Sequence, residues 1–437
     1  MATRRWLGAA KQVTQVSTIT ITGTWSGSDT VTVTINNIES TITVGSLTTT
    51  SHVATTLQQA WEGVTLTDTT AASSPTIADG GFKVIPEFYE VTATVSSNVV
   101  TLTARTSGKP VTISVSDTAA SGTATHSVTT TATGKWFWDN VDNWSGNTVP
   151  VDNDAIVFDT GDVDLRYNLS AAIQPASVVI TQGYTGKIGL AEVNSDDTSK
   201  AYSEYRGKYL TFDDNSVTCT YTIGQGDGNG SRRIKIDAGA GQSTVIVHNT
   251  ATRNELDFPT ILFKGTHASN QFTIYKGDAG VAFLAGDTST VATLRCGTEQ
   301  GGSVKFVAGS GTTLTTVNTA GNGTVQLNSN CTTLTMTGCN VEYMAGAPAT
   351  ANVWNGALID RSTTTIGTAL TVGTTGSYDR TYDTRAKTIT PKVSLYKGAR
   401  FLDPNMTLTY TGGVQFVGCK PSDTTFDPGF NRSITIS

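Results

Sequence analysis

The sequence has few charged residues and no long apolar run. Charged side chains make up 15% and hydrophobic side chains 37% of its 437 residues, and both shares are below those of typical soluble domains. No segment approaches the roughly 20 consecutive apolar residues of a membrane-spanning helix, so we expect no membrane partner. Met1–Gly8 contains two arginines with no apolar run behind them, which argues against a secretory signal at this position.

Clustered positive charge and the usual side chains of catalytic centres are also missing. The net charge is −6 and the pI about 5.3, and the lysines and arginines are scattered, whereas a nucleic-acid partner requires them in clusters. The four histidines are dispersed, and no serine lies in a G-x-S-x-G motif. The sequence therefore predicts no nucleic-acid partner, no cofactor and no metal.

The five cysteines are too few and too widely spaced to indicate a disulfide or metal framework. Their number is odd and none belongs to a C-x-x-C pair. Because free cysteine behaves as a small apolar side chain, we expect core positions for them. They are Cys219, Cys296, Cys331, Cys339 and Cys419.

Threonine, serine, asparagine and glycine take the place of the missing charge. Threonine and valine favour strands because branching at Cβ suits a pleated surface, and the 44 glycines supply the positive φ values of tight turns. Many short strands joined by turns are expected, so the fold class is mainly β. A chain of this length exceeds one hydrophobic core, which predicts at least two folding units.

The first unit is predicted to be a β-rich module over residues 13–133 with one helix, preceded by an arm over residues 1–12. Alternating apolar and threonine residues indicate strands at Thr18–Thr22 and Thr30–Ile35, with a turn between them. Further strands are expected at Ser40–Val44, Glu90–Val95, Val99–Ala104 and Val111–Val115.

The one helix of the module is predicted to begin at Ser51, a good N-cap residue. Apolar residues recur there at helical spacing, and the helix should lie across one face of the sheet. These residues are Val53, Leu57, Ala60, Trp61 and Val64.

A cluster of tryptophans follows the module and suggests the joint between two domains. Trp136, Trp138 and Trp144 fall within nine residues, and Pro150 marks a turn after them. The Thr/Ala-rich stretch from Ala119 to Gly134 is interpreted as the link that leads into this joint.

Residues 134–353 are predicted to form a parallel β-solenoid. Short strands end in glycines that are 9 to 12 residues apart, which suits two or three strands per coil of about twenty residues. Tandem β-sandwich domains are the alternative, since they space strands similarly. The strand units of the predicted solenoid include Ile261–Gly265, Phe272–Gly277, Val281–Gly286, Val291–Gly297 and Val304–Gly309.

The looser pattern of residues 354–437 suggests a C-terminal β cap or an oligomerisation region.

Seven carboxylates could form a catalytic pair, but a surface turn also explains each of them. Glycan hydrolysis uses two carboxylates, about 5 Å apart for retention or about 6.5 to 9.5 Å apart for inversion, and stacked coils could supply such a pair. Each candidate is next to turn-forming residues, so we predict that the protein is not an enzyme. The candidates are Asp213, Asp214, Asp227, Asp237, Asp278, Asp287 and Glu299.

Two other groups of residues are candidate binding elements. Tyr202, Tyr205, Arg206 and Tyr209 form an aromatic and basic cluster that could bind a sugar or a partner subunit, with a packed loop as the alternative. The loop Gly224–Gly230 alternates glycine with Asp and Asn, yet it lacks the EF-hand start and the distal glutamate. A turn is the expected structure there.

Two segments resemble known protein families. Thr20–Asn36, the helix and Val100–Val115 (VTLTARTSGKPVTISV) resemble an N-terminal module of tailed-bacteriophage virion proteins. Asn143–Phe158 (NWSGNTVPVDNDAIVF) resembles the entry segment of autotransporter-like β-helices. An autotransporter would also need an export signal and barrel-forming strands at its C-terminus, so the phage resemblance fits better.

Together these resemblances imply a structural protein of a phage virion, as a fibre, tail or capsid-decoration component that is assembled in the host cytoplasm. They imply a homo-oligomer, with a homotrimer expected, and contacts with other virion proteins and with host-surface glycan. A tailspike-like polysaccharide depolymerase and a bacterial surface or matrix protein are the alternatives.

Overall fold

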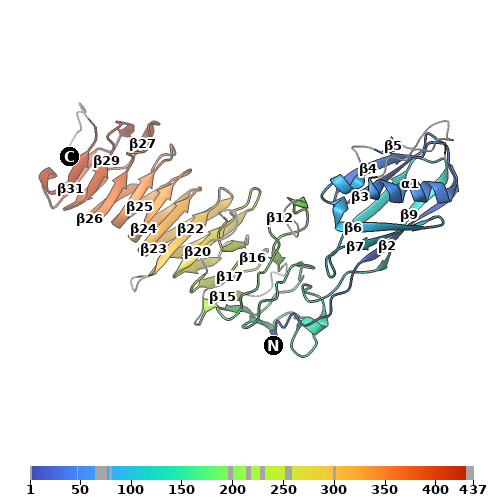
Figure 1. Cartoon of the computed structure of the whole chain (residues 1–437). Coiled ribbons are helices and arrows are strands. Elements are labelled where there is room, and N and C mark those ends of the chain that lie inside the picture. Colours follow the sequence, from blue (N-terminus) through green and yellow to red (C-terminus); the bar gives the residue numbers. More distant parts are fainter. Residues whose placement is uncertain are drawn as a thin grey trace.

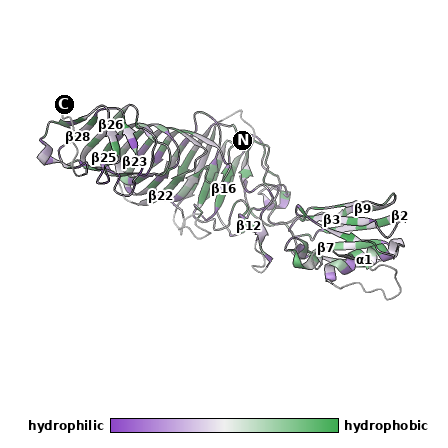
Figure 2. Ribbon diagram, turned by 90° about the horizontal axis from the view of Figure 1, so that it is seen from above, coloured by the Kyte–Doolittle hydropathy of each residue, from purple (hydrophilic) through white to green (hydrophobic). Residues whose placement is uncertain are grey.

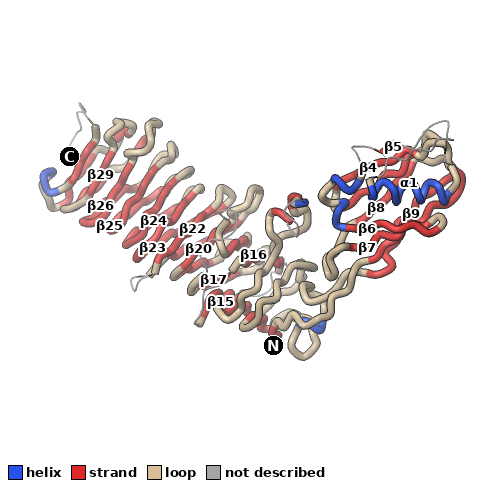
Figure 3. Tube along the Cα trace, in the orientation of Figure 1, coloured by secondary structure: helices blue, strands red, loops and turns tan. Residues whose placement is uncertain are grey.

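The computed structural model shows a long stack of parallel strands with a smaller β-rich module near its N-terminal end (Figure 1). It describes residues 2–46, 48–63, 76–77, 81–194, 200–212, 218–226, 232–250, 258–298 and 302–429. Figure 3 shows that loops dominate where the stack meets the module, and that strands dominate beyond this region.

Of the described strands, 20 belong to one sheet, and each pairs in parallel with its neighbours. The first part of this sheet consists of β1 (Thr3–Arg5), β10 (Ala155–Phe158), β11 (Ser177–Thr181), β14 (Leu210–Thr211), β15 (Cys219–Gln225), β16 (Ile234–Asp237), β17 (Ser243–Val247), β18 (Ile261–Lys264), β19 (Gln271–Ile274) and β20 (Gly277–Val281). It continues with β21 (Ser289–Cys296), β22 (Ser303–Ala308), β23 (Thr312–Leu327), β24 (Cys331–Tyr343), β25 (Pro348–Asp360), β26 (Ala369–Asp379), β28 (Val393–Tyr396), β29 (Arg400–Leu402), β31 (Val414–Val417) and β32 (Thr425–Asp427).

The stack is a β-solenoid whose coils carry two strands each over most of its length. From β15 onward, strands pair with the second strand along the chain, as in β15–β17–β19–β21 and β16–β18–β20–β22. In β23 to β26 the two strands merge into one long strand bent at a corner. Thr316 pairs with Thr333, and Thr333 with Thr350, so one coil takes 17 residues there. The predicted solenoid is confirmed, and tandem sandwiches, which need antiparallel sheets, are excluded for this region.

Inward-facing side chains form a continuous apolar column inside the coils. Aromatic rings follow one another in Phe212, Tyr221, Phe263, Phe272 and Phe306, with centroids 6.1, 6.0, 5.8 and 5.6 Å apart. Such spacings suit offset or edge-to-face contact, and complete burial of each large apolar side chain contributes about 1.5–3 kcal/mol. Figure 2 shows the alternation of hydrophobic and polar residues along the strands.

The predicted N-terminal arm, residues 1–12, contains the first strand of the solenoid. β1 pairs in parallel with β10, with Thr3 opposite Ala155 and Arg5 opposite Val157. The module is therefore an insertion between the first two strands of the stack. The sequence does not reveal this strand, because three residues are too few to show an alternating pattern. Its pairing is hidden as well, because the partner strand lies about 150 residues away in the sequence.

The solenoid also continues through the predicted boundary at residues 353 and 354. β25 spans this position, and parallel pairing runs on through β32. The pattern loosens here because the coils acquire an extra pair of parallel strands, β27 (Lys387–Ile389) and β30 (Leu408–Tyr410). Residues 354–429 are thus further coils of the same stack, and a short 3₁₀ turn, η6 (Pro421–Asp423), precedes β32.

The module contains two four-stranded antiparallel sheets around a separate core. Their strand orders are β6-β7-β2-β9 and β5-β4-β3-β8. Helix α1 packs on β2, β6 and β7 of the first sheet, as predicted. The elements are β2 (Val16–Thr24), β3 (Thr30–Ile35), β4 (Ile38–Thr43), α1 (Thr50–Glu62), β5 (Thr76–Ile77), η2 (Phe82–Val84), η3 (Phe88–Glu90), β6 (Val91–Ser96), β7 (Val99–Ala104), β8 (Ile113–Asp117) and β9 (Ser121–Thr130).

The predicted helix cap was wrong. The helix is capped by Thr49, whose Oγ1 accepts a hydrogen bond from the His52 N–H at 3.3 Å, and not by Ser51. The Thr/Ala-rich stretch at the end of the module contains a strand that was not predicted, β9, which pairs with β2 along nine positions. The sequence hides this strand because its buried residues are small, Gly122 and Ala124. Val64 lies outside the described residues.

The strand predicted at Val281–Gly286 was also wrong. The observed strand, β20, ends at Val281. The segment 282–287 after it forms a turn, in which Ala282 has a φ of 45°. Asp287 accepts a hydrogen bond from the Leu284 N–H at 3.3 Å within this turn. Phe283, which suggested a strand, packs edge-on against Phe258.

Candidate functional site

The predicted tryptophan joint lies at the base of the solenoid core. Trp144 is fully buried, and its indole N–H donates to the Trp138 carbonyl at 2.7 Å. Trp6, just after β1, completes the cluster with its ring centroid 5.1 Å from that of Trp144. Trp136 is partly buried, and the guanidinium carbon of Arg166 lies 4.9 Å from the centroid of its ring. Pro150 is buried in the segment that precedes β10.

The chain enters and leaves the module at neighbouring points. Val13 and Thr133 form an antiparallel bridge, in which the Val13 N–H donates to the Thr133 carbonyl at 2.9 Å. The buried Asn143 accepts from the Ala10 N–H at 2.9 Å and donates to the carbonyls of Gly134 and Phe137, both at 2.8 Å. One asparagine from the joint thus ties both crossings to the solenoid.

A hairpin of the solenoid, β12 (Val193–Asn194) and β13 (Tyr202–Ser203), reaches the module and makes a second contact with it. The Tyr202 hydroxyl accepts from the Asn36 side-chain NH₂ at 3.1 Å and from that of Asn194 at 3.0 Å. The Tyr205 hydroxyl donates to Asn36 Oδ1 at 2.7 Å. Two of the residues predicted as a binding cluster therefore contact the module of the same chain.

Charged residues close the same contact. Lys109 of the module is 2% exposed, and its Nζ lies 2.7 Å from Glu90 Oε1 and 3.0 Å from Asn194 Oδ1. Arg206 forms a two-pronged pair with Glu204 at 2.8 and 2.9 Å and donates to the Pro110 carbonyl at 3.0 Å. For this cluster the geometry fits the alternative of a packed loop.

Burial has opposite effects on two side chains of this contact. Burial, together with the charge of Glu90, raises the pKa of Tyr202 well above its ordinary value, so the phenol stays protonated. Burial alone would lower the pKa of Arg206, but the paired Glu204 carboxylate outweighs it and raises the pKa. Both groups keep their charge state across the physiological pH range.

Tyr209, the fourth residue of the predicted cluster, belongs to a different group on the solenoid. Its hydroxyl donates to Asp287 Oδ2 at 2.5 Å. Lys264 Nζ lies 3.4 Å from Asp237 Oδ2, 3.3 Å from Asp287 Oδ1 and 4.6 Å from the Tyr209 ring centroid. The coils thus bring together two of the predicted carboxylates, Asp237 and Asp287, around one ammonium group.

This group is arranged as an ion pair between coils. Both carboxylates contact the same ammonium group, whereas a glycosidase needs one carboxyl group free to donate a proton to the leaving group. Burial and the bond to Asp287 raise the pKa of Tyr209, which remains a hydrogen-bond donor. Asp278 is engaged separately, accepting from the Thr260 N–H at 3.3 Å. Asp213, Asp214, Asp227 and Glu299 lie outside the described residues.

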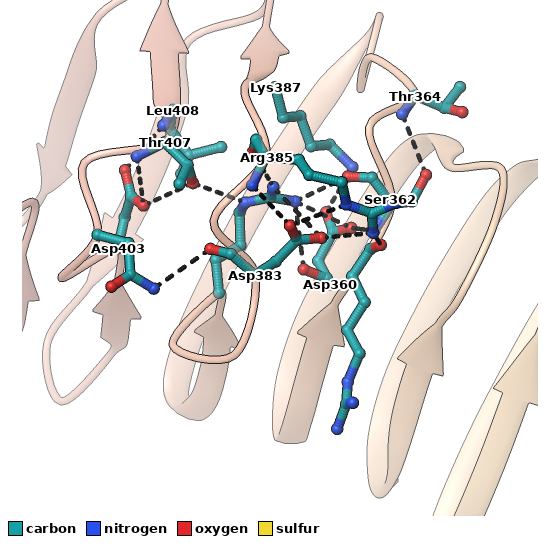
Figure 4. A network of polar contacts seen from close by, with 12 residues as sticks. Asp360, Ser362, Thr364, Asp383, Arg385, Lys387, Asp403, Thr407 and Leu408 are labelled. Carbon is teal, nitrogen blue, oxygen red and sulfur yellow. Dashed lines mark hydrogen bonds and ion pairs between the residues drawn. The ribbon is translucent and has the colours of Figure 1, made fainter.

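A buried charge network lies between the coils near the C-terminal end (Figure 4). Lys387 Nζ lies 2.5 Å from Asp360 Oδ2, and the Tyr378 hydroxyl donates to the same oxygen at 2.7 Å. Arg380 donates to the carbonyls of Ser362 at 2.8 Å and Arg385 at 2.7 Å. Burial lowers the pKa of Lys387 although Asp360 opposes this shift.

The same network continues into the next coil. Asp403 accepts from the N–H groups of Thr407 and Leu408, both at 2.9 Å, and the Thr407 hydroxyl accepts from Arg380 Nε at 3.1 Å. Nothing in the sequence pattern predicted this network, because its central residue Asp360 contacts Tyr378 and Lys387, which are 18 and 27 residues away. Its polar atoms are saturated by protein groups, so it acts as a lock between coils.

The described residues also bear on metal binding, thiol chemistry and membrane crossing. Among the described residues, no group of three or more His, Cys, Asp or Glu side chains could hold a metal ion. Four cysteines are buried and Cys419 is half-buried, and all five have free thiols. Within the described part of the chain, no helix has the length and apolar character to cross a membrane. Residues 227–230 of the Gly224–Gly230 loop lie outside the described residues.

Comparison with family models, with curated proteins and with solved structures finds no match to this chain. Function must therefore be argued from the geometry and from the sequence resemblances.

Proposed function

We propose that the protein is a structural component of a bacteriophage particle, as a fibre, tail or capsid-decoration protein. In this proposal the inserted module attaches to the particle, and the solenoid projects from it or packs against neighbouring subunits. The observation that carries the proposal is the unbroken parallel stack joined at its base to one compact module. The resemblance of residues 20–115 to a module of phage virion proteins supports the same assignment.

The architecture suits a part that transmits load between two ends. Parallel strand pairing joins neighbouring coils from β1 to β32, so stability accumulates along the stack. The module is tied to the solenoid by two chain crossings at Val13 and Thr133 and by the hairpin contact at Tyr202 and Tyr205. A single flexible linker would not fix the direction of the solenoid in this way.

The arrangement of charges supports a structural role over a catalytic one. Asp237 and Asp287 share Lys264, and Asp360 shares Lys387 and Tyr378. Each carboxylate is committed to a partner in an adjacent coil, which stabilises the stacking register. A polysaccharide depolymerase would instead need a carboxyl group poised to protonate a leaving group.

Purified particles provide the test of this proposal. Phage particles are purified on a density gradient from a culture of the phage whose genome encodes this protein. Quantitative mass spectrometry of the gradient fractions should find the protein at a constant ratio to the major capsid protein. The isolated full-length chain should form a homo-oligomer, expected to be a trimer, in a mass measurement at micromolar concentration. Absence from the particles, together with a stable monomer, would refute the proposal.

A further inference from the structure

An exposed tryptophan stands at the corner where the long strands of the solenoid bend. Trp354 is 39% exposed and is the extra residue of a β-bulge, since Met336 pairs with Val353 and Thr337 with Asn355. Bulges re-aim a side chain and recur at functional positions. In the described part of the chain no protein group engages the indole N–H of Trp354, so this donor is available to a ligand.

The tryptophan is held as a flat platform by the two coils that follow. A Cβ at Gly373 would lie 2.3 Å from the Trp354 ring, so the ring covers the bare backbone of β26. The next coil supplies Tyr396, whose ring centroid is 5.4 Å from that of Trp354 at a 56° angle. Thr375 donates its hydroxyl hydrogen to the Trp354 carbonyl at 3.0 Å.

A shallow groove of about 140 Å³ adjoins this platform on the preceding coils. Its lining consists of glycines, one cysteine and three asparagines, Asn322, Asn340 and Asn355, from β23, β24 and β25. Asn340 Oδ1 accepts from the Ala357 N–H at 3.2 Å, and within the described residues its NH₂ group has no partner. Asn355 follows Trp354 in β25, so the groove lies beside the platform. Its side chain donates to the Thr337 carbonyl at 3.3 Å and accepts from the Gly356 N–H at 3.0 Å, so Asn340 supplies the free amide NH₂ of this pair.

The chemistry of this surface defines its ligand. The groove lining holds amides and no carboxylate or ammonium group, and an amide both donates and accepts hydrogen bonds. An aromatic face beside a few placed polar groups is typical of a small-molecule site. A sugar ring has an apolar C–H face and a rim of hydroxyl groups, which matches this combination.

We propose that the Trp354–Tyr396 platform and the adjoining asparagine groove bind a neutral glycan chain that lies along the solenoid axis. The surface runs across the coils of β23, β24, β25, β26 and β28, which at the spacing of neighbouring strands is about 19 Å. That length accommodates several sugar units. This inference rests on the proposed function, since it supplies the surface by which a particle protein would hold a host glycan.

Four proteins suffice for the test. They are the wild type, Trp354→Ala, Gly373→Ala and the control Tyr275→Ala, which removes an aromatic ring that is also 39% exposed. Gly373 does not have a positive φ, and the methyl group added by Gly373→Ala would fall 2.3 Å from Cε3 and 3.1 Å from Cα of Trp354, so it displaces the tryptophan ring with a small shift of the neighbouring backbone. The probe is an array of neutral hexose and N-acetylhexosamine oligosaccharides of three to six units, followed by calorimetric titration of each bound compound.

The wild type and Tyr275→Ala should bind the same oligosaccharides with equal affinity. Both platform variants should lose at least about tenfold, the usual loss when an aromatic anchor is removed or misplaced. Circular dichroism and mass measurement serve as controls for folding and assembly.

Three outcomes would overturn the inference. These are binding of no compound by the wild type, equal loss in the Tyr275 control, or a change of oligomeric state in Trp354→Ala without a change in glycan affinity. The last outcome would identify the platform as a contact between copies. Because the experiment uses the isolated chain, failure here leaves the particle assay of the proposed function unaffected, and absence from particles leaves a measured glycan affinity intact.

Discussion

At the scale of single residues, the base of the solenoid depends on aromatic side chains from two distant parts of the sequence. Trp144 is fully buried between Trp6 and Trp138, with ring centroids 5.1 and 4.8 Å away. Trp6 belongs to the arm before the module, and the other two follow the module. These contacts close the end of the apolar column beneath β1 and β10.

Replacing Trp144 by alanine should therefore destabilise the base of the stack by about 3–5 kcal/mol, the usual range for loss of a large buried aromatic side chain. Chemical denaturation followed by circular dichroism measures the change. Tyr382→Ala is the matched control, because this ring is 71% exposed and its loss should change stability by no more than about 0.5 kcal/mol. Equal effects of the two substitutions would show that the tryptophan cluster does not close the core.

A second residue-scale prediction concerns Asp154, which holds β1 in place. Its Oδ1 accepts from the Ala2 N–H at 2.8 Å and its Oδ2 from Arg4 Nε at 3.2 Å. Burial raises the pKa of Asp154, but these hydrogen bonds and one from the Val151 N–H outweigh it and hold the pKa below its ordinary value. The stabilisation is therefore complete above about pH 4 and is lost as the pH falls through the lowered value.

Hydrogen-exchange protection factors of Thr3–Arg5 measure this loss. In the wild type they should fall as the pH is lowered below about 4, and in Asp154→Asn they should be lower at neutral pH and nearly independent of pH over the same range. Protection in the wild type that does not change with pH would contradict the assignment of Asp154 as the clamp of β1.

The buried pair of Lys387 and Asp360 gives a third prediction. Lys387→Met leaves the Asp360 charge buried with one partner fewer and should cost about 3–5 kcal/mol. Lys387→Met combined with Asp360→Leu removes both charges, but it also removes the carboxylate that lies 3.5 Å from Arg380 Nη1 and accepts from Tyr378, so it should recover part of the lost stability. Chemical denaturation measures the stability of both variants. If Lys387 and Asp360 stabilise the coils as a pair, the double variant should be the more stable of the two. If their contributions are independent, the double variant should be the less stable.

At the scale of elements, the insertion of the module between β1 and β10 is the main feature that the sequence pattern did not reveal. Period-2 strands, turn glycines and the single helix were predictable, because each follows from local steric preferences. The pairing of β1 with β10 and of β2 with β9 was not, since it joins residues more than 90 positions apart. For the same reason Tyr202 and Tyr205 could be picked out from the sequence, but their partner Asn36 could not.

The insertion predicts that the module can be removed without loss of the solenoid. Replacing residues 14–132 by a short Gly/Ser linker should keep β1, because the Val13 N–H and the Thr133 carbonyl are only 2.9 Å apart. The matched control is a chain that starts at residue 134, which lacks the module and also β1 and Trp6. Thermal unfolding should show the linker variant to be the more stable. Equal stability would contradict the placement of β1 in the stack.

At the scale of the whole molecule, the module and the C-terminal coils lie at opposite ends of a long stack (Figure 1). The module sits at one end, fixed by the joint and the hairpin, and the Trp354–Tyr396 platform lies on coils toward the other end. An attachment end and an exposed end are what a particle-bound stalk requires. The charge networks at Lys264 and Lys387 keep the coils between these ends in register.

Immunogold electron microscopy of purified particles with two antibodies tests this account most directly. One antibody should recognise the module over residues 13–133, and the other the outer face of β25 and β26. The account predicts that intact particles bind the solenoid antibody, while the module antibody binds only after the particles are dissociated. Labelling by neither antibody before or after dissociation, or labelling of intact particles by the module antibody alone, would contradict it.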